Sequence, residues 1–236
     1  MKRALLILLA LLLMIHCTAF CETVAEAPVT TVVCVGDSIT FGAGVTGREN
    51  TYPAMLQAML GEGFVVKNCG ENGRTLQREG MLNPPDASFN FPMTYWDSQV
   101  MTTAVNAAPD IVIIMLGTND AKDWNWNAEN YTSQYAELIR YFQSLPGEPR
   151  VYAVIPPPGF DAHEGVKAAD SIDREILAAL GDCIREATQA CGCPVIDLYG
   201  VFEGRGELFP DGIHPNAEGN RIIARQICES LAAEVE

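Results

Sequence analysis

The sequence predicts an α/β fold, a three-layer α/β/α sandwich around a five-stranded parallel sheet. Five short runs rich in β-branched residues alternate with longer amphipathic stretches along the chain. This alternation is typical of parallel strands joined by helices that cover both faces of a sheet. Five strands favour the flavodoxin-like strand order 2-1-3-4-5 with right-handed crossovers. A chain of 236 residues is long enough for one such domain with a full core.

The first element along the chain has the features of a signal peptide. Lys2 and Arg3 precede an apolar run at 4–15, whose length is typical of a signal-peptide core and short for a membrane span. Small residues at the two cleavage-specifying positions, Ala19 and Cys21, place the cut after Cys21.

The expected organisation is therefore a signal peptide at 1–21, a short lead-in at 22–30 and one folded domain at 31–236. The bulky Phe20 before Cys21 disfavours a lipoprotein anchor. We expect a secreted or periplasmic protein without stable membrane insertion after cleavage.

The remaining elements follow in alternation, with one irregular exception. The apolar, β-branched composition of five runs predicts strands at 31–36, 64–69, 110–116, 150–155 and 194–199. Amphipathic periodicity predicts helices at 52–60, 97–107, 130–144, 170–190 and 216–233. The segment 74–98 has no periodicity, and a segment of that length in a compact domain is often a binding loop.

The charge of the chain excludes one class of partner. There are 30 acidic residues against 15 Lys and Arg, and no basic patch of the kind that binds nucleic acid stands out. The acid excess indicates solubility and tolerance of neutral or cationic ligands.

Polar and glycine residues follow each strand where it ends. The first strand leads into Gly-Asp-Ser at 36–38, the second into Gly-Glu-Asn-Gly at 70–73, and the third into Gly-Thr-Asn-Asp at 117–120. In the order 2-1-3 these three strands are neighbours. We therefore expect Ser38, Gly73 and Asn119 to converge at the switch point of the sheet, where such folds bind ligands.

Two other interpretations of Gly-Asp-Ser are weaker. A phosphate-binding loop needs a Lys at a fixed spacing, which is missing, and the dinucleotide-binding glycine pattern is missing as well. Asp37 or Ser38 capping a following helical turn is plausible. A cap alone does not explain why Asp211 and His214 are predicted at the same edge.

A nucleophilic serine explains all of these residues. A serine hydroxyl needs a base to remove its proton, and His214 follows Asp211 by three residues in the last loop. Asp211 would orient the imidazole and stabilise the imidazolium while its other nitrogen faces Ser38. The backbone N–H groups of Ser38 and Gly73 and the Asn119 amide would form the oxyanion hole.

These blocks, "GDSIT", "NCGENGRT", "GTND" and "DGIH", resemble the GDSL-type esterases, or SGNH hydrolases, in order and spacing from about residue 31 to about 230. The resemblance implies an SGNH hydrolase domain, ester hydrolysis by Ser38, Asp211 and His214, and neither metal nor cofactor. An α/β-hydrolase is disfavoured because the chain has no Gly-x-Ser-x-Gly elbow.

The stretches around Asn119 and His214 resemble bacterial sialate O-acetylesterase-like and acetylxylan esterase-like members. An exported serine acetylesterase acting on a small-molecule or oligosaccharide ester is therefore expected. A lipid or aryl esterase of the lysophospholipase or thioesterase type is the alternative, and a non-catalytic carbohydrate-binding protein is the least favoured. Trp124, Trp126, Tyr95 and Trp96 are candidates for stacking on sugar rings, and core packing is an equal alternative.

The six cysteines outside the leader suggest a disulfide after export. In the predicted topology, Cys228 on the last helix ends near Cys191 and Cys193, so a bridge to either is feasible. A zinc site is disfavoured, since one residue separates Cys191 from Cys193 and structural zinc sites usually have two to four.

Overall fold

Five parallel strands form one sheet, in the order β2-β1-β3-β4-β5, in a computed structural model that describes residues 29–167 and 171–233. The strands are β1 (Thr30–Gly36), β2 (Phe64–Gly70), β3 (Ile111–Met115), β4 (Arg150–Ile155) and β5 (Val195–Asp197). The predicted parallel sheet and its strand order are confirmed. The predicted signal peptide and residues 22–28 of the lead-in lie outside the described residues.

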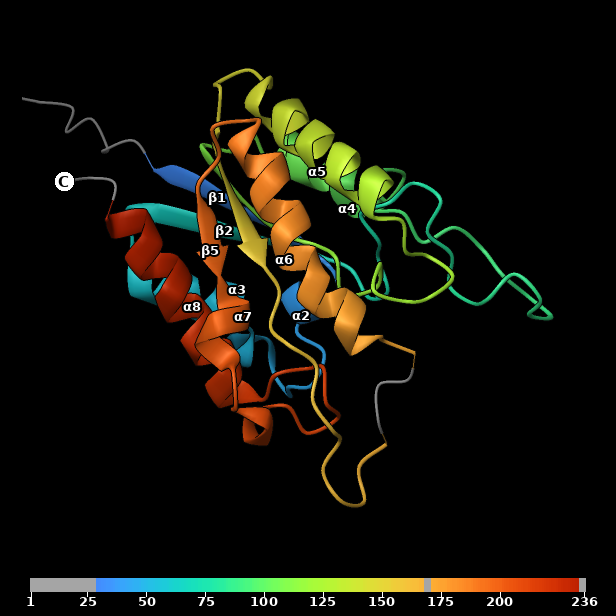
Figure 1. Cartoon of the computed structure of the whole chain (residues 1–236). Coiled ribbons are helices and arrows are strands. Elements are labelled where there is room, and N and C mark those ends of the chain that lie inside the picture. Colours follow the sequence, from blue (N-terminus) through green and yellow to red (C-terminus); the bar gives the residue numbers. More distant parts are fainter. Residues whose placement is uncertain (1–28, 168–170, 234–236) are drawn as a thin grey trace, which may run out of the picture.

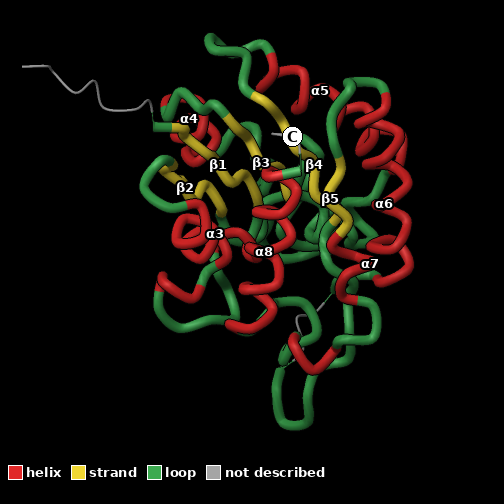
Figure 2. Tube along the Cα trace, turned by 90° about the vertical axis from the view of Figure 1, so that its left-hand side faces the viewer, coloured by secondary structure: helices red, strands yellow, loops and turns green. Residues whose placement is uncertain are grey.

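Helices cover both faces of the sheet and complete three layers (Figures 1 and 2). One face is covered by α4 (Gln99–Asn106), α5 (Ala128–Gln143) and α6 (Arg174–Gln189). The other is covered by α2 (Ser38–Phe41), α3 (Tyr52–Leu60), α7 (Leu198–Phe202) and α8 (Ala217–Ala232). Two one-turn 3₁₀ helices are η1 (Arg48–Asn50) and η2 (Gly206–Leu208). Among the described helices, none has the length and apolar character needed to cross a membrane.

The central strand β1 shows why the core divides into two clusters. Val33 and Val35 belong to the cluster under α4, α5 and α6, whereas Val32 and Cys34 belong to the cluster under α3 and α8. All four side chains are fully buried. Successive side chains of a strand point to opposite faces, so a strand buried on both sides is a continuous apolar run.

Local capping corrects two predicted boundaries. The helix predicted over 170–190 begins only at Arg174, because the Asp173 side chain accepts hydrogen bonds from the backbone N–H groups of Glu175 and Ile176. The strand predicted over 194–199 ends at Asp197, whose side chain caps α7 by accepting from the Gly200 N–H. A polar residue with a capping geometry therefore ends the extended conformation in the middle of an apolar run.

The predicted irregular segment 74–98 contains no helix and only two isolated bridges, Thr75 with Thr94 and Met81 with Pro92. Its first part is held by Asp120, which is fully buried and accepts hydrogen bonds from the N–H groups of Leu76 and Gln77, both at 2.8 Å. A buried carboxylate on the β3–α5 loop therefore fixes the chain that follows Gly73.

Asp120 should make stability depend on pH. Burial raises its pKa to about 7, although hydrogen bonds from Gln77 and Leu76 oppose the shift. A raised pKa means that the folded state binds the proton more tightly than the unfolded state. The stabilising contribution is then complete below about pH 4 and is lost as pH rises to about 7, a change on the order of 4 kcal/mol.

Asp120→Asn should lower the free energy of unfolding at acid pH and flatten this dependence. Urea unfolding between pH 4.5 and 7.5 measures it, with the exposed neighbour Asp123→Asn as the control. An unchanged difference between acid and neutral pH in Asp120→Asn would show that Asp120 titrates at its ordinary value.

The predicted disulfide is wrong for this structure, which has no disulfide among the six described cysteines. Cys191 and Cys193 belong with the cluster under α5 and α6, and the Cys193 thiol donates to the Val151 carbonyl at 3.1 Å. Cys228 packs in the cluster on the opposite face of the sheet. The sheet therefore separates the side chains of Cys191 and Cys193 from that of Cys228.

Candidate active site

The first strand ends with Gly36, a position where no larger residue fits. A Cβ at Gly36 would lie 2.8 Å from the Met115 carbonyl oxygen and 2.0 Å from Thr40 Oγ1. The next residue, Asp37, caps α2 by accepting a hydrogen bond from the Ile39 N–H at 2.9 Å. The capping interpretation and the nucleophile interpretation are therefore compatible, because the cap holds Ser38 at the start of the helix.

A continuous chain of hydrogen bonds joins Asp211, His214 and Ser38. Asp211 Oδ2 lies 2.6 Å from His214 Nδ1, and His214 Nε2 lies 2.8 Å from Ser38 Oγ. The other oxygen of Asp211 accepts from the backbone N–H groups of Ile213 at 3.0 Å and His214 at 2.7 Å. The short turn from 211 to 214 thus fixes the carboxylate against the imidazole, while tertiary structure brings Ser38 from 176 residues away.

The electrostatics of the two nearby carboxylates differ. Burial raises the pKa of Asp211, but hydrogen bonds from the side chain and backbone of His214 and from the Ile213 N–H outweigh it and hold the pKa below its usual range. Asp37 is fully buried, and burial raises its pKa to about 6. Its Oδ2 has no hydrogen-bond partner among the described residues. Asp211, which is hydrogen-bonded to His214, therefore stays ionised throughout the neutral range.

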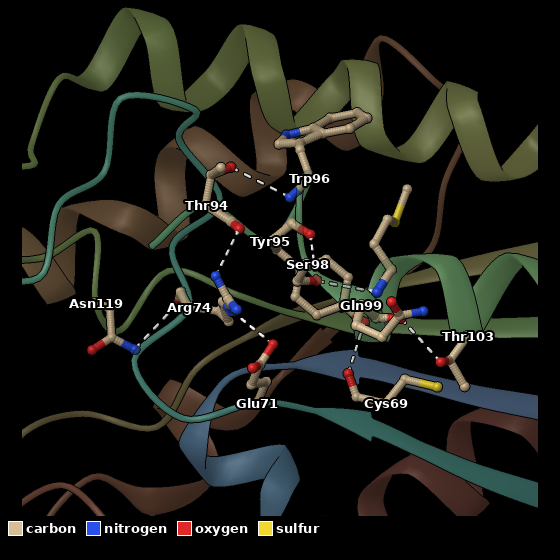
Figure 3. A network of polar contacts seen from close by, with 11 residues as sticks. Cys69, Glu71, Arg74, Thr94, Tyr95, Trp96, Ser98, Gln99, Thr103 and Asn119 are labelled. Atoms are coloured by element: carbon tan, nitrogen blue, oxygen red, sulfur yellow. Dashed lines mark hydrogen bonds and ion pairs between the residues drawn. The ribbon is translucent and has the colours of Figure 1, made fainter. Parts of the chain in front are cut away.

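Ser38 and His214 open into a cavity of about 310 Å³, which Gly73 and Asn119 also line. Gly73 has φ +78°, a left-handed conformation that favours glycine, and a Cβ there would lie 2.7 Å from Met93 Cε. The Asn119 amide donates to the Arg74 carbonyl at 3.2 Å, which ties the third loop to the second (Figure 3). The structure thus brings Ser38, Gly73, Asn119 and His214 together from four loops.

The four predicted aromatic residues do not line this cavity. Tyr95 is corrected to a core residue: it has no exposed surface, and its hydroxyl donates to the Cys69 carbonyl at 2.7 Å. A side chain without exposed surface cannot stack on a sugar. Trp96 points toward α5 and away from Asn119 (Figure 3), with its ring under the Arg78 guanidinium at 3.8 Å and against Tyr141.

The other two tryptophans follow Asn119 in the β3–α5 loop. Trp126 packs on Tyr131 at the edge of the core, with ring centroids 5.5 Å apart. Trp124 is half-buried and donates its indole N–H to the Met81 carbonyl at 3.2 Å. Contact of Trp124 or Trp126 with substrate stays a prediction.

Six further residues line the cavity and were not predicted as site residues: Ala43, Asn72, Thr118, Lys122, Ile172 and Ile213. Asn72, Thr118 and Ile213 are part of the recognised blocks, so their place beside Gly73, Asn119 and His214 was a usable signal. Lys122 follows Asn119 by three residues, but a surface lysine would give the same pattern. Ile172 lies in a segment predicted to be helical, where no sequence signal marked it.

This arrangement is chemically suited to attack by a serine on an ester carbonyl. A serine hydroxyl bonded to an imidazole that is in turn bonded to a carboxylate is the geometry of an activated nucleophile. Among the described residues, no group of three or more metal-ligating side chains is found.

Residues 34–222 match the model of the GDSL-like lipase/acylhydrolase family. An acetylxylan esterase of Xylanibacter ruminicola is 30% identical over 225 residues, which cover 87% of this chain and 43% of the relative. The chain spans about half the length of the curated relatives it matches.

Solved structures agree with the fold. A carbohydrate acetylesterase family member of Sinorhizobium meliloti has a TM-score of 0.63 and 25% sequence identity, covering 86% of this chain and 97% of its own. An aryl esterase of M. smegmatis has a TM-score of 0.67 at 21% identity, covering 86% of this chain and 99% of its own, and at that identity it supports the fold alone.

Proposed function

This chain belongs to the GDSL-like lipase/acylhydrolase family, whose members are carboxylic ester hydrolases, and we propose that it is an exported serine esterase that removes acetyl groups from carbohydrates. The observation that carries the proposal is the hydrogen-bonded series from Asp211 through His214 to Ser38 at the wall of a cavity. Export is supported by the signal-peptide features of residues 1–21.

In the first half of the proposed reaction, Ser38 Oγ attacks the ester carbonyl while its proton passes to His214 Nε2. Asp211 holds the Nδ1 proton and stabilises the imidazolium that forms. The negative charge that develops on the carbonyl oxygen is stabilised by donors from three loops: the backbone N–H groups of Ser38 and Gly73 and the side-chain amide of Asn119.

The first half ends with release of the alcohol, and the second half releases the acid. The imidazolium gives its proton to the leaving alcohol, and the acyl group stays on Ser38. Water then enters, loses a proton to His214 Nε2 and attacks the acyl carbonyl, and the same oxyanion hole stabilises the negative charge on the carbonyl oxygen. The bond from the acyl carbon to Ser38 Oγ then breaks, the imidazolium returns its proton to that oxygen, and the acid leaves. The Asn119 amide, bonded to the Arg74 carbonyl at 3.2 Å, has a second N–H for this purpose.

Two observations support acetyl esters over longer ones. The relatives named above include an acetylxylan esterase and a carbohydrate acetylesterase family member. The cavity of about 310 Å³ is at the small end of the range for ligand pockets. A small cavity favours a compact ester group beside Ser38.

Steady-state hydrolysis of p-nitrophenyl acetate, p-nitrophenyl octanoate and acetylated xylo-oligosaccharides tests the proposal, with Ser38→Ala as the control for uncatalysed hydrolysis. We expect higher kcat/KM for acetate than for octanoate and release of acetate from the oligosaccharides. A preference for octanoate would favour a lipid esterase. Rapid cleavage of the p-nitrophenyl esters without release from the sugars would favour an aryl esterase.

A further inference from the structure

Lys122 is a cation in the wall of the cavity that contains Ser38. It lies in the β3–α5 loop, three residues after Asn119, and lines the same cavity. Only 8% of its surface is exposed. Lysine is rarely buried to this extent unless its charge has a partner, so its position raises the question of what pairs with it.

The protein itself supplies no ion pair to this ammonium. No carboxylate in the described part of the chain lies within 4.0 Å of it. Its Nζ lies over the Trp124 ring, 5.6 Å from the ring centroid. The carboxylates that influence it are Asp120 and then Asp37. Asp120 is already engaged by the N–H groups of Leu76 and Gln77.

Burial shifts the pKa values of Lys122, Asp120 and Asp37, and these shifts weaken the attraction between the ammonium and the two carboxylates. Burial lowers the pKa of Lys122, and Asp120 and Asp37 only partly oppose this. Burial also raises the pKa of Asp120 to about 7 and that of Asp37 to about 6, so Asp120 carries only part of its negative charge at neutral pH. Asp120 and Asp37 therefore act on the ammonium only from a distance, and no carboxylate of the described residues pairs with it directly.

Substrate binding raises the free-energy cost of leaving the Lys122 ammonium without a partner. In the empty cavity, water can solvate the ammonium. A bound ester displaces that water, and a buried charge without an acceptor is costly. A carboxylate of the substrate would supply a charge-assisted hydrogen bond, whereas a neutral hydroxyl would supply a weaker one.

We propose that Lys122 binds a carboxylate on the alcohol part of the ester, so that the site prefers acetylated acidic sugars to acetylated neutral ones. This inference rests on the proposed function, because an acetyl group is too small to carry a second charged group and the anion must then be on the alcohol. The site is a local exception in a chain with a formal net charge of −15, whose acid excess by itself indicates neutral or cationic ligands.

The test uses two substrates that differ only at one carbon, a mono-acetylated methyl glucuronoside and the matching methyl glucoside. The wild type should show a kcat/KM about tenfold or more higher for the acid, the size expected of one hydrogen bond to a charged group. Lys122→Met should bring the ratio of the two values to about one. Lys67→Met, which removes an exposed charge on β2, should leave the ratio as in the wild type.

A second measurement does not depend on turnover. Calorimetric titration of Ser38→Ala with the two esters should give a Kd about tenfold lower for the acid, and the double variant Ser38→Ala, Lys122→Met should bind both equally. Thermal melting confirms that each variant is folded.

A wild-type ratio at or below one, or an equal loss on both substrates in Lys122→Met, would overturn the inference. If the wild type hydrolyses neither ester, the proposed function fails, and the titration still decides whether Lys122 selects the anion.

Discussion

Ser38→Ala should lower kcat/KM for p-nitrophenyl acetate by about 10⁴-fold or more, leaving only the residual rate that the oxyanion hole and substrate binding supply. The reason is that Ser38 Oγ is the atom proposed to form the acyl bond, and it is hydrogen-bonded to His214 Nε2 at 2.8 Å. The side chain is small and 8% exposed, so its loss should leave the fold unchanged.

Two further measurements separate the loss of the nucleophile from unfolding. The melting temperature of Ser38→Ala should match that of the wild type, and an active-site phosphonate should label the wild type at Ser38 and leave the variant unlabelled. Ser133→Ala, which changes an exposed serine on α5, should keep full activity. Substantial turnover by Ser38→Ala would require a different nucleophile.

Asp211→Asn should reduce kcat by about 10⁴-fold while KM changes little. In the wild type, Asp211 Oδ2 accepts from His214 Nδ1 at 2.6 Å, which leaves Nε2 as the nitrogen that can take the proton of Ser38. The remaining carbonyl oxygen of an asparagine can still accept the backbone N–H groups of Ile213 and His214. Its NH₂ group then faces Nδ1 and favours the wrong tautomer of the imidazole.

The pH profile adds a check on the same residue. Hydrogen bonds from His214 and Ile213 outweigh the effect of burial and hold the pKa of Asp211 below its usual range, so the carboxylate stays ionised throughout the neutral range. Wild-type activity should therefore not fall from protonation of Asp211 anywhere near neutral pH.

For the Asp211→Asn substitution, Asp182→Asn, on the exposed side of α6, is the matched control and should keep wild-type kcat. Equal activity in Asp211→Asn would show that His214 needs no carboxylate.

Local patterns were sufficient to predict the architecture. The alternation of β-branched runs and amphipathic stretches predicted the parallel sheet and its order, which are confirmed. The same patterns predicted that the polar residues following the strands lie at one edge of the sheet. The structure brings three of these residues, Ser38, Asn119 and His214, into one cavity. The Asp-x-x-His spacing at 211–214 needs only one turn of chain, so the contact of these two side chains is a local property.

The sequence by itself thus determined the five strands, the five long helices and the residues that follow each strand, because strand and helix periods are properties of neighbouring residues. The short helices α2 and α7 and the exact start of α6 were not predicted. Only the tertiary structure decided which loop side chains face the cavity. Tyr95 turned out to be core because the Cys69 carbonyl accepts its hydroxyl, and Lys122 turned out to line the cavity. Cys193 and Cys228 were separated by the sheet. The orientation of a loop side chain depends on partners distant in sequence, such as Asp120 with Leu76 and Gln77, and no local pattern records those partners.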